Sequence, residues 1–171
     1  RPEAPALVPA TGRTLNYAEL AQQVDSMAHW LRQTGIRREQ RVAIMLPAGC
    51  DLAVVITAVL CNAVAVPLDS ALPRSEFLEL LSLLRIDAVL TNWEDLVPVQ
   101  WSRRPNCEDG SFADLKLFVS ETPSISGPGA QTDGHERLAL ILRTSGTTAH
   151  PKLVAATHGN IAEWAGQLQR R

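Results

Sequence analysis

Residues 41–68 read RVAIMLPAGCDLAVVITAVLCNAVAVPL, two short apolar runs on either side of a longer one. The apolar run over 41–46 predicts a short buried strand, which Pro47 ends. A helix is expected from Asp51 to about Cys61, and a second buried strand is expected over 63–66. Because both strands are almost continuously apolar, they predict a parallel sheet with helices packed on it.

The same alternation begins before this stretch. Asn16 is a good N-cap, and Glu19 three residues later completes a capping-box pattern. A helix is therefore predicted over 16–34, and Gly35 supplies a left-handed end. Its inward face carries apolar residues at helical spacing. These are Leu20, Val24, Met27, Ala28 and Leu31.

The alternation also continues after it. Pro73 opens a helix that runs to Leu84, with Phe77, Leu80, Leu81 and Leu84 facing inward. Residues 87–91 predict the next strand, and further strands are expected over 115–119 and 138–143. The expected fold class is α/β, a layered and mostly parallel sheet flanked by helices.

The chain divides into three parts by its pattern. Residues 1–119 predict a first α/β subdomain, and 120–137 predict a loop or linker, because 120–134 has no periodicity and is rich in Gly and Pro. Residues 138–171 predict a strand, a loop, a strand and a helix that open the next subdomain. The strand–loop–strand over 138–157 is expected at the edge of the first sheet or at the start of a second one.

Composition excludes several classes of protein. The chain has 171 residues, 46% of them hydrophobic, and a formal charge of −2, which argues against nucleic-acid binding. The apolar stretch over 52–68 is too short and too interrupted for a membrane span. The N-terminus lacks the pattern of a signal peptide. Cys50, Cys61 and Cys107 form no CxxC, so Cys50 and Cys61 are expected as buried free thiols in a cytoplasmic protein without a zinc site.

Residues 144–152 read TSGTTAHPK and follow directly on the strand over 138–143. Small and hydroxyl residues in a turn expose backbone N–H groups and hydroxyls on one side, and Lys152 adds a positive charge. This combination suits a polyanion such as a phosphate chain. The segment is not a Walker A loop, because Pro151 precedes Lys152 and Leu153 follows it. From chemistry alone, an ordinary Ser/Thr turn is the alternative.

The pattern TSGTTxxPK, followed by an apolar strand and Thr-His-x-Asn, resembles the phosphate loop of the adenylate-forming enzymes. That superfamily contains acyl-CoA synthetases, adenylation domains of nonribosomal peptide synthetases, and firefly luciferase. Residues 12–20, 41–47 and 63–69 resemble further segments of the family, in the same order and at similar spacing. The resemblance covers nearly the whole chain and implies the incomplete N-terminal lobe of such an enzyme.

The resemblance implies a two-step reaction. A carboxylate attacks the α-phosphate of ATP in the presence of Mg²⁺, and a thiol of coenzyme A or of a carrier-protein phosphopantetheine arm then takes the acyl group. The positions that would wrap the terminal phosphates are Thr144, Ser145, Gly146, Thr147, Thr148 and Lys152. The acyl pocket, the metal-binding residue and the catalytic lysine are expected beyond Arg171, in the remainder of a longer chain. This piece alone is expected to be inactive.

Two positions depart from the family pattern, which usually has Gly where Ala149 and Leu153 stand. They leave open an alternative, a non-catalytic binding or scaffolding module that keeps the fold. In the same region, His150 is expected to be an exposed loop histidine and His158 to cap or brace the next helix. Asn160 is expected to be the N-cap of a helix over 161–169.

Overall fold

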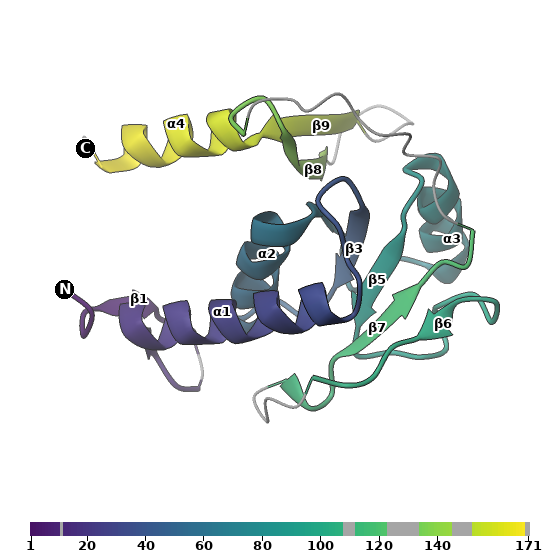
Figure 1. Ribbon diagram of the computed structural model, residues 1–171, viewed down its shortest axis with the longest axis horizontal. Helices are drawn as coiled ribbons and strands as arrows, with labels where there is room; N and C mark the ends of the chain where they lie inside the picture. Colours follow the sequence, from purple (N-terminus) through teal and green to yellow (C-terminus); the bar gives the residue numbers. More distant parts are fainter. Residues whose placement is uncertain (11, 108–111, 123–133, 145–151, 170–171) are drawn as a thin grey trace.

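The computed structural model describes residues 1–10, 12–107, 112–122, 134–144 and 152–169 (Figure 1). Within these ranges the helices are α1 Tyr17–Gln33, α2 Cys50–Asn62, α3 Arg74–Leu83 and α4 His158–Gln169. The strands are β1 Pro5–Leu7, β2 Leu15–Asn16, β3 Arg41–Met45, β4 Val64–Pro67, β5 Ala88–Thr91, β6 Ser102–Arg103, β7 Lys116–Val119, β8 Leu138–Thr144 and β9 Lys152–Thr157.

Seven strands form one sheet in the order β6-β7-β5-β3-β4-β8-β9. Strands β3, β4, β5, β6 and β8 run in one direction, whereas β7 and β9 run in the other. The sheet is therefore mostly parallel, and the α/β fold class is confirmed. The β8–β9 hairpin lies at one edge of this sheet, which is the first of the two places expected from the sequence.

The central strand β3 is buried on both faces. Val42 and Ile44 point into an apolar cluster that includes side chains of α1 and α2. Ala43 and Met45 point into a second cluster, which includes side chains of α3. All four residues have no exposed surface, as expected for a strand covered by helices on both sides.

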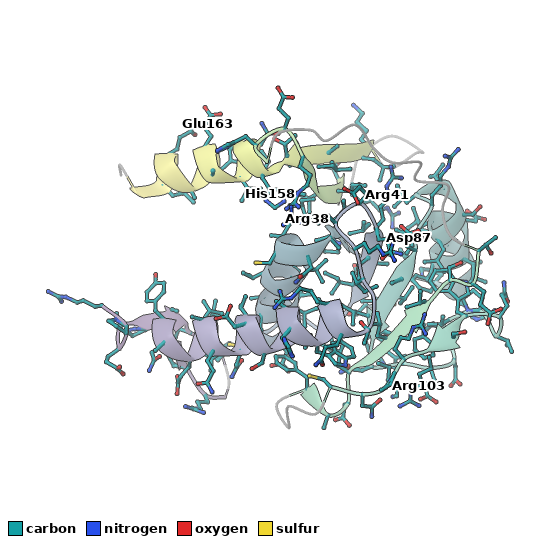
Figure 2. All side chains as sticks on the ribbon, viewed as in Figure 1. Arg38, Arg41, Asp87, Arg103, His158 and Glu163 are labelled. Atoms are coloured by element: carbon teal, nitrogen blue, oxygen red, sulfur yellow. The ribbon has the colours of Figure 1, made fainter. Side chains whose placement is uncertain are left out.

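A buried carboxylate fixes the start of β3 beside β5. The backbone N–H of Arg41 donates to Asp87 Oδ2 at 2.8 Å, and the N–H of Asp87 donates to the Arg41 carbonyl at 2.9 Å. The Arg41 guanidinium donates to the Leu84 carbonyl at the end of α3. Figure 2 shows Arg41 and Asp87 next to one another. This end of the sheet is thus held by hydrogen bonds to polar groups that would otherwise be buried without partners.

Helix α1 begins and ends as the sequence predicts. The Asn16 side chain accepts from the N–H of Glu19 at 2.8 Å, and the Glu19 carboxylate accepts from the N–H of Asn16 at 3.0 Å. These two bonds complete the capping box. Gly35 has φ +87°, the left-handed conformation that favours glycine after a helix.

The start of α4 corrects the prediction for Asn160. The helix begins at His158 rather than at 161, and Thr157 stands at the capping position. Thr157 Oγ1 accepts from the N–H of Asn160 at 3.2 Å, and Asn160 Oδ1 accepts from the N–H of Thr157 at 3.0 Å. Thr and Asn are both good caps, and the reciprocal pair places the helix start at the earlier one.

The cysteines lie differently from the prediction. Cys61 is exposed and Cys50 is half-buried, whereas Cys107 is the buried one. Cys61 lies near the end of α2, whose buried residues include Ala58 and Val59. All three are free, so the prediction of free thiols is confirmed.

No helix in the described ranges is both long and apolar enough to cross a membrane. Most of the segment over 120–137, namely residues 123–133, lies outside the described residues. The division into parts at 119 and 137 stays a prediction.

Replacing Phe77 by Ala should cost about 3–5 kcal/mol of unfolding free energy, because its ring is completely buried between α3 and the sheet. Urea unfolding followed by circular dichroism measures the loss. Leu83→Ala on the same helix is the matched control, since Leu83 is 69% exposed and its truncation should change stability by about 0.5 kcal/mol or less. Equal losses in the two variants would contradict the packing of α3 described above.

Candidate functional site

The two ends of the TSGTTAHPK segment face one another across the β8–β9 hairpin. Thr144 is the last residue of β8, Lys152 is the first of β9, and the two are register partners. Thr144 Oγ1 donates to the Lys152 carbonyl at 3.2 Å. The other predicted site residues, Ser145, Gly146, Thr147 and Thr148, lie outside the described residues, as do Ala149 and His150.

The hairpin end lies at the carboxyl edge of the parallel strands. Strands β3, β4, β5 and β8 are mutually parallel, so their carboxyl ends meet at the same edge of the sheet. Ligands of open α/β sheets bind outside this edge. Lys152 is exposed there and makes no ion pair with any residue the structure describes. Its ammonium is therefore not neutralised by a carboxylate of those residues.

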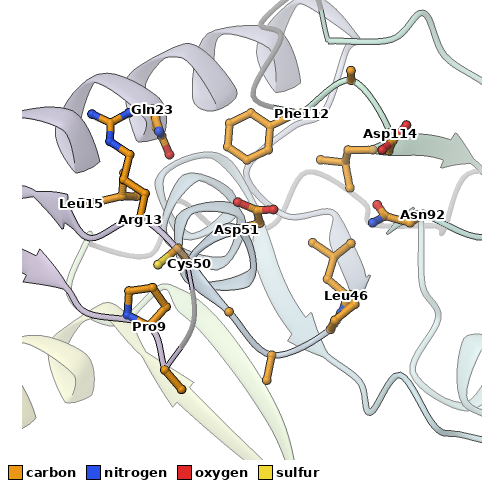
Figure 3. A pocket seen from close by; sticks show the side chains of 16 residues that line it. Pro9, Arg13, Leu15, Gln23, Leu46, Cys50, Asp51, Asn92, Phe112 and Asp114 are labelled. Atoms are coloured by element: carbon orange, nitrogen blue, oxygen red, sulfur yellow. The ribbon is translucent and has the colours of Figure 1, made fainter.

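A cavity of about 790 Å³ lies at the same edge (Figure 3). It opens where β3 and β5 end, between Leu46 and Asn92. Figure 3 shows Arg13 and Gln23 on one side and Asn92 and Asp114 on the other. Its lining comes from five segments far apart in the chain, and no local pattern predicts such a convergence.

One arginine connects the end of β8 to the body of the protein. The Arg143 guanidinium pairs with the Glu76 carboxylate of α3. Arg143 precedes Thr144, so this ion pair lies directly before the first residue of the 144–152 segment. No local sequence pattern predicts this pair, because Arg143 and Glu76 are 67 positions apart.

His158 joins the start of α4 to Arg137, the residue that precedes β8. Its N–H donates to the Arg137 carbonyl at 3.0 Å, and its Nε2 lies 2.7 Å from an Arg137 guanidinium nitrogen. The Gly159 N–H also donates to the His135 carbonyl, at 2.8 Å. These contacts confirm that His158 braces the helix (Figure 2).

The contact with Arg137 requires a neutral imidazole. A guanidinium has donors and no acceptor, so Nε2 of His158 must accept, and the proton of the neutral ring lies on Nδ1. Burial lowers the pKa of His158, and the positive charges of Arg137 and then His135 lower this pKa further. The groups that act on this ring therefore all disfavour its protonation.

The described residues contain no group of three or more His, Cys, Asp and Glu side chains that could hold a metal ion. The metal-binding residue expected beyond Arg171 stays a prediction.

The protein is an open, mostly parallel α/β sheet with both ends of a hydroxyl-rich segment, Thr144 and Lys152, at its carboxyl edge. Residues 1–170 match the family described as AMP-binding enzyme, and the chain belongs to that family. The resemblance to adenylate-forming enzymes, first suggested by residues 144–152, is confirmed.

Curated relatives are peptide synthetases much longer than this chain. AMB antimetabolite synthetase AmbB of Pseudomonas aeruginosa is 34% identical over 168 residues, which are 94% of this chain and 13% of that protein. Cyclosporin synthetase simA of Tolypocladium inflatum is 33% identical over 160 residues, which are 90% of this chain and 1% of that protein. The chain thus spans a small part of each relative.

Solved structures share the fold. The N-terminal subdomain of Klebsiella oxytoca NpsA in complex with 3-hydroxybenzoyl-AMSN is 27% identical with a TM-score of 0.64, over 92% of this chain and 38% of that one. The nonribosomal peptide synthetase FmoA3, bound to alpha-methyl-L-serine-AMP, is 24% identical with a TM-score of 0.69, over 99% of this chain and 18% of that one. The chain therefore has the fold of the N-terminal domains of adenylate-forming enzymes.

His158 should make the stability of the chain fall as the pH falls. Because its folded-state pKa lies below the unfolded value of 6.5, the unfolded chain binds this proton first. The contribution is complete above pH 6.5 and is lost as the pH falls through the folded-state pKa. Urea unfolding at a series of pH values from 7.5 to about 5 measures the slope.

His158→Gln keeps an acceptor for Arg137 and removes the titration, so it should flatten part of this slope. His29→Gln, on the exposed face of α1, is the matched control and should leave the slope unchanged. A slope in the His158 variant equal to that of the parent would show that His158 does not contribute.

Proposed function

We propose that the chain is the N-terminal part of an ATP-dependent ligase that activates a carboxylic acid, and that residues 144–152 hold the phosphates of ATP. In the reaction, a carboxylate oxygen attacks the α-phosphorus and pyrophosphate leaves, which gives an acyl-adenylate. A thiolate sulfur then attacks the acyl carbon, so that a thioester forms and AMP leaves. The observation that carries the proposal is the family's hydroxyl-rich segment, with its two ends paired at the carboxyl edge of the sheet.

The positive charge at the described end of the segment, on Lys152, complements the negative charge of a phosphate chain. Lys152 is exposed, without an ion pair among the described residues, and would act as a point charge toward a terminal phosphate. Thr144 donates its hydroxyl proton to the Lys152 carbonyl, so it holds the two strands together. We therefore assign Lys152 to the phosphates, with Ser145, Thr147 and Thr148 as further donors and Gly146 leaving room for the backbone to approach.

Magnesium would neutralise charge on the phosphates when bound. The phosphate oxygens would hold it together with an acidic residue, which the family resemblance places beyond Arg171. What this chain contributes is the placement of one end of the nucleotide. In-line attack also requires the carboxylate to be positioned.

The acceptor thiol belongs either to coenzyme A or to a phosphopantetheine arm on a carrier protein. The curated relatives are peptide synthetases, which favours the tethered carrier. We accordingly propose a carboxylic acid substrate, a carrier protein and the remainder of a longer chain as partners, in the cytoplasm.

The second candidate is a non-catalytic module that keeps the fold. It is favoured by Ala149 and Leu153, which stand where the family usually has Gly. Leu153 is 41% exposed at the start of β9. The two candidates differ in whether residues 144–152 contribute to nucleotide binding.

In the intact parent enzyme, Lys152→Ala should weaken ATP dependence or lower the rate by roughly tenfold to a hundredfold. A charge-assisted contact to a phosphate is worth about 1.5–3 kcal/mol, and each 1.4 kcal/mol is about tenfold. Carboxylate-dependent pyrophosphate exchange measures the adenylation half-reaction. Arg38→Ala removes an exposed cation at the opposite edge of the sheet and should have no effect. An unchanged ATP dependence in the Lys152 variant, with stability intact, would remove Lys152 from the site.

The isolated chain should show only background pyrophosphate exchange with any carboxylic acid. Holding the phosphates lowers the barrier only when the attacking carboxylate is also aligned, and the proposal places those groups outside this chain. Robust exchange by the purified chain would show that it contains the acyl site.

A further inference from the structure

We infer that the ion pair between Arg143 and Glu76 positions the phosphate-binding segment by fixing the end of the β8–β9 hairpin to α3. The inference rests on the proposed function for the phosphate role, and on the geometry alone for the anchoring. Arg143 and Glu76 act here as positioning residues, because they hold Thr144 and Lys152 in place and do not themselves contact the nucleotide.

The hairpin end extends beyond the strand that supports it. Strand β4 pairs with β8 in parallel, with Ala65 opposite Leu140. Counted from this pair, β4 ends at Pro67 opposite Leu142, so Arg143 and Thr144 run past it. Beyond that point β9 is the only described strand beside β8. Backbone hydrogen bonds to the body of the sheet therefore do not hold the last residues of β8.

Apolar packing holds the hairpin end only weakly. Leu142 on β8 and Val154 on β9 are register partners, and both are exposed, at 37% and 43%. Leu153, which is paired with Arg143, is exposed as well. The last residue of β8 that packs fully into an apolar cluster is Ile141. Among the described residues from Leu142 to Thr144, a polar contact has to supply the connection to the body.

The Arg143–Glu76 pair is that connection. The Arg143 side chain is 28% exposed and that of Glu76 is 35% exposed, so the pair is partly shielded from water. Glu76 precedes Phe77, whose completely buried ring fixes α3 against the sheet. The carboxylate is therefore held on a rigid element, and the guanidinium fixes the residue next to Thr144 relative to it.

A direct electrostatic effect of the two charges and a positioning role predict opposite changes in anion affinity for Glu76→Gln. If the two charges acted on phosphate only through space, Glu76→Gln would remove a negative charge and strengthen anion binding. If the pair positions the hairpin, Glu76→Gln weakens binding, because it releases Arg143. The sign of this one change separates the two explanations.

The experiment uses the chain as it is, with inorganic tripolyphosphate as the probe. Isothermal titration calorimetry gives the affinity, and amide hydrogen exchange reports the opening of residues 142–144 and 152–154. The variants are Arg143→Gln, Glu76→Gln, and the charge swap that combines Arg143→Glu with Glu76→Arg. Glu79→Gln, an exposed carboxylate on the same helix without an ion pair among the described residues, is the matched control.

Each single variant should lower the affinity roughly twofold to fivefold, the range of exposed to partly buried ion pairs, and speed exchange at the hairpin end. The charge swap should restore both readouts, and Glu79→Gln should change neither. Tighter binding by Glu76→Gln, or hairpin exchange that is unchanged in both single variants, would overturn the inference.

The failure of the proposed function is a separate result. If the unsubstituted chain binds no tripolyphosphate, the phosphate role fails, and hydrogen exchange alone then decides whether the pair anchors the hairpin. Faster exchange in both single variants, restored by the swap, would support the anchoring; unchanged exchange would overturn it.

Discussion

The burial of β3 on both faces is the constraint on which the rest of the structure depends. Its apolar residues alternate between a cluster with α1 and α2 and a cluster with α3, and none of Val42, Ala43, Ile44 and Met45 is exposed. A strand covered on both sides needs helices on both faces, and crossover connections of this kind make its neighbours parallel. The parallel sheet in turn places the ends of β3, β4, β5 and β8 at one edge.

The proposed phosphate-binding segment begins and ends at that edge. Thr144 and Lys152 stand there as the two ends of the hydroxyl-rich segment, and the cavity bounded by Leu46 and Asn92 opens at the same edge. The packing of the core therefore also determines where the segment lies. The residues that bury β3 fix the position of the sheet, and the sheet fixes the position of Thr144 at the end of β8. Arg143 and Glu76 complete the placement where the sheet no longer supports β8.

Local patterns were sufficient for elements whose signal lies within a few residues. The capping pair Asn16–Glu19, the apolar runs of β3 and β4, and the TSGTTAHPK motif were all readable in this way. Strand order, the reversed direction of β7, the cavity and the Arg143–Glu76 pair were not, because each depends on segments far apart in the chain. The prediction of where α4 starts was wrong for a different reason. Thr157 and Asn160 are both good caps, and the two hydrogen bonds between them place the helix start after Thr157.

The most direct test of the central claim, that this segment receives the phosphates of a nucleotide, is an NMR titration of the isotope-labelled chain with ATP and, separately, with adenosine. The backbone amide signals of Thr144 and Lys152 should shift with ATP and stay in place with adenosine, because the contact is to phosphate. Equal shifts with both ligands, or shifts with ATP confined to residues remote from the β8–β9 hairpin, would contradict the claim.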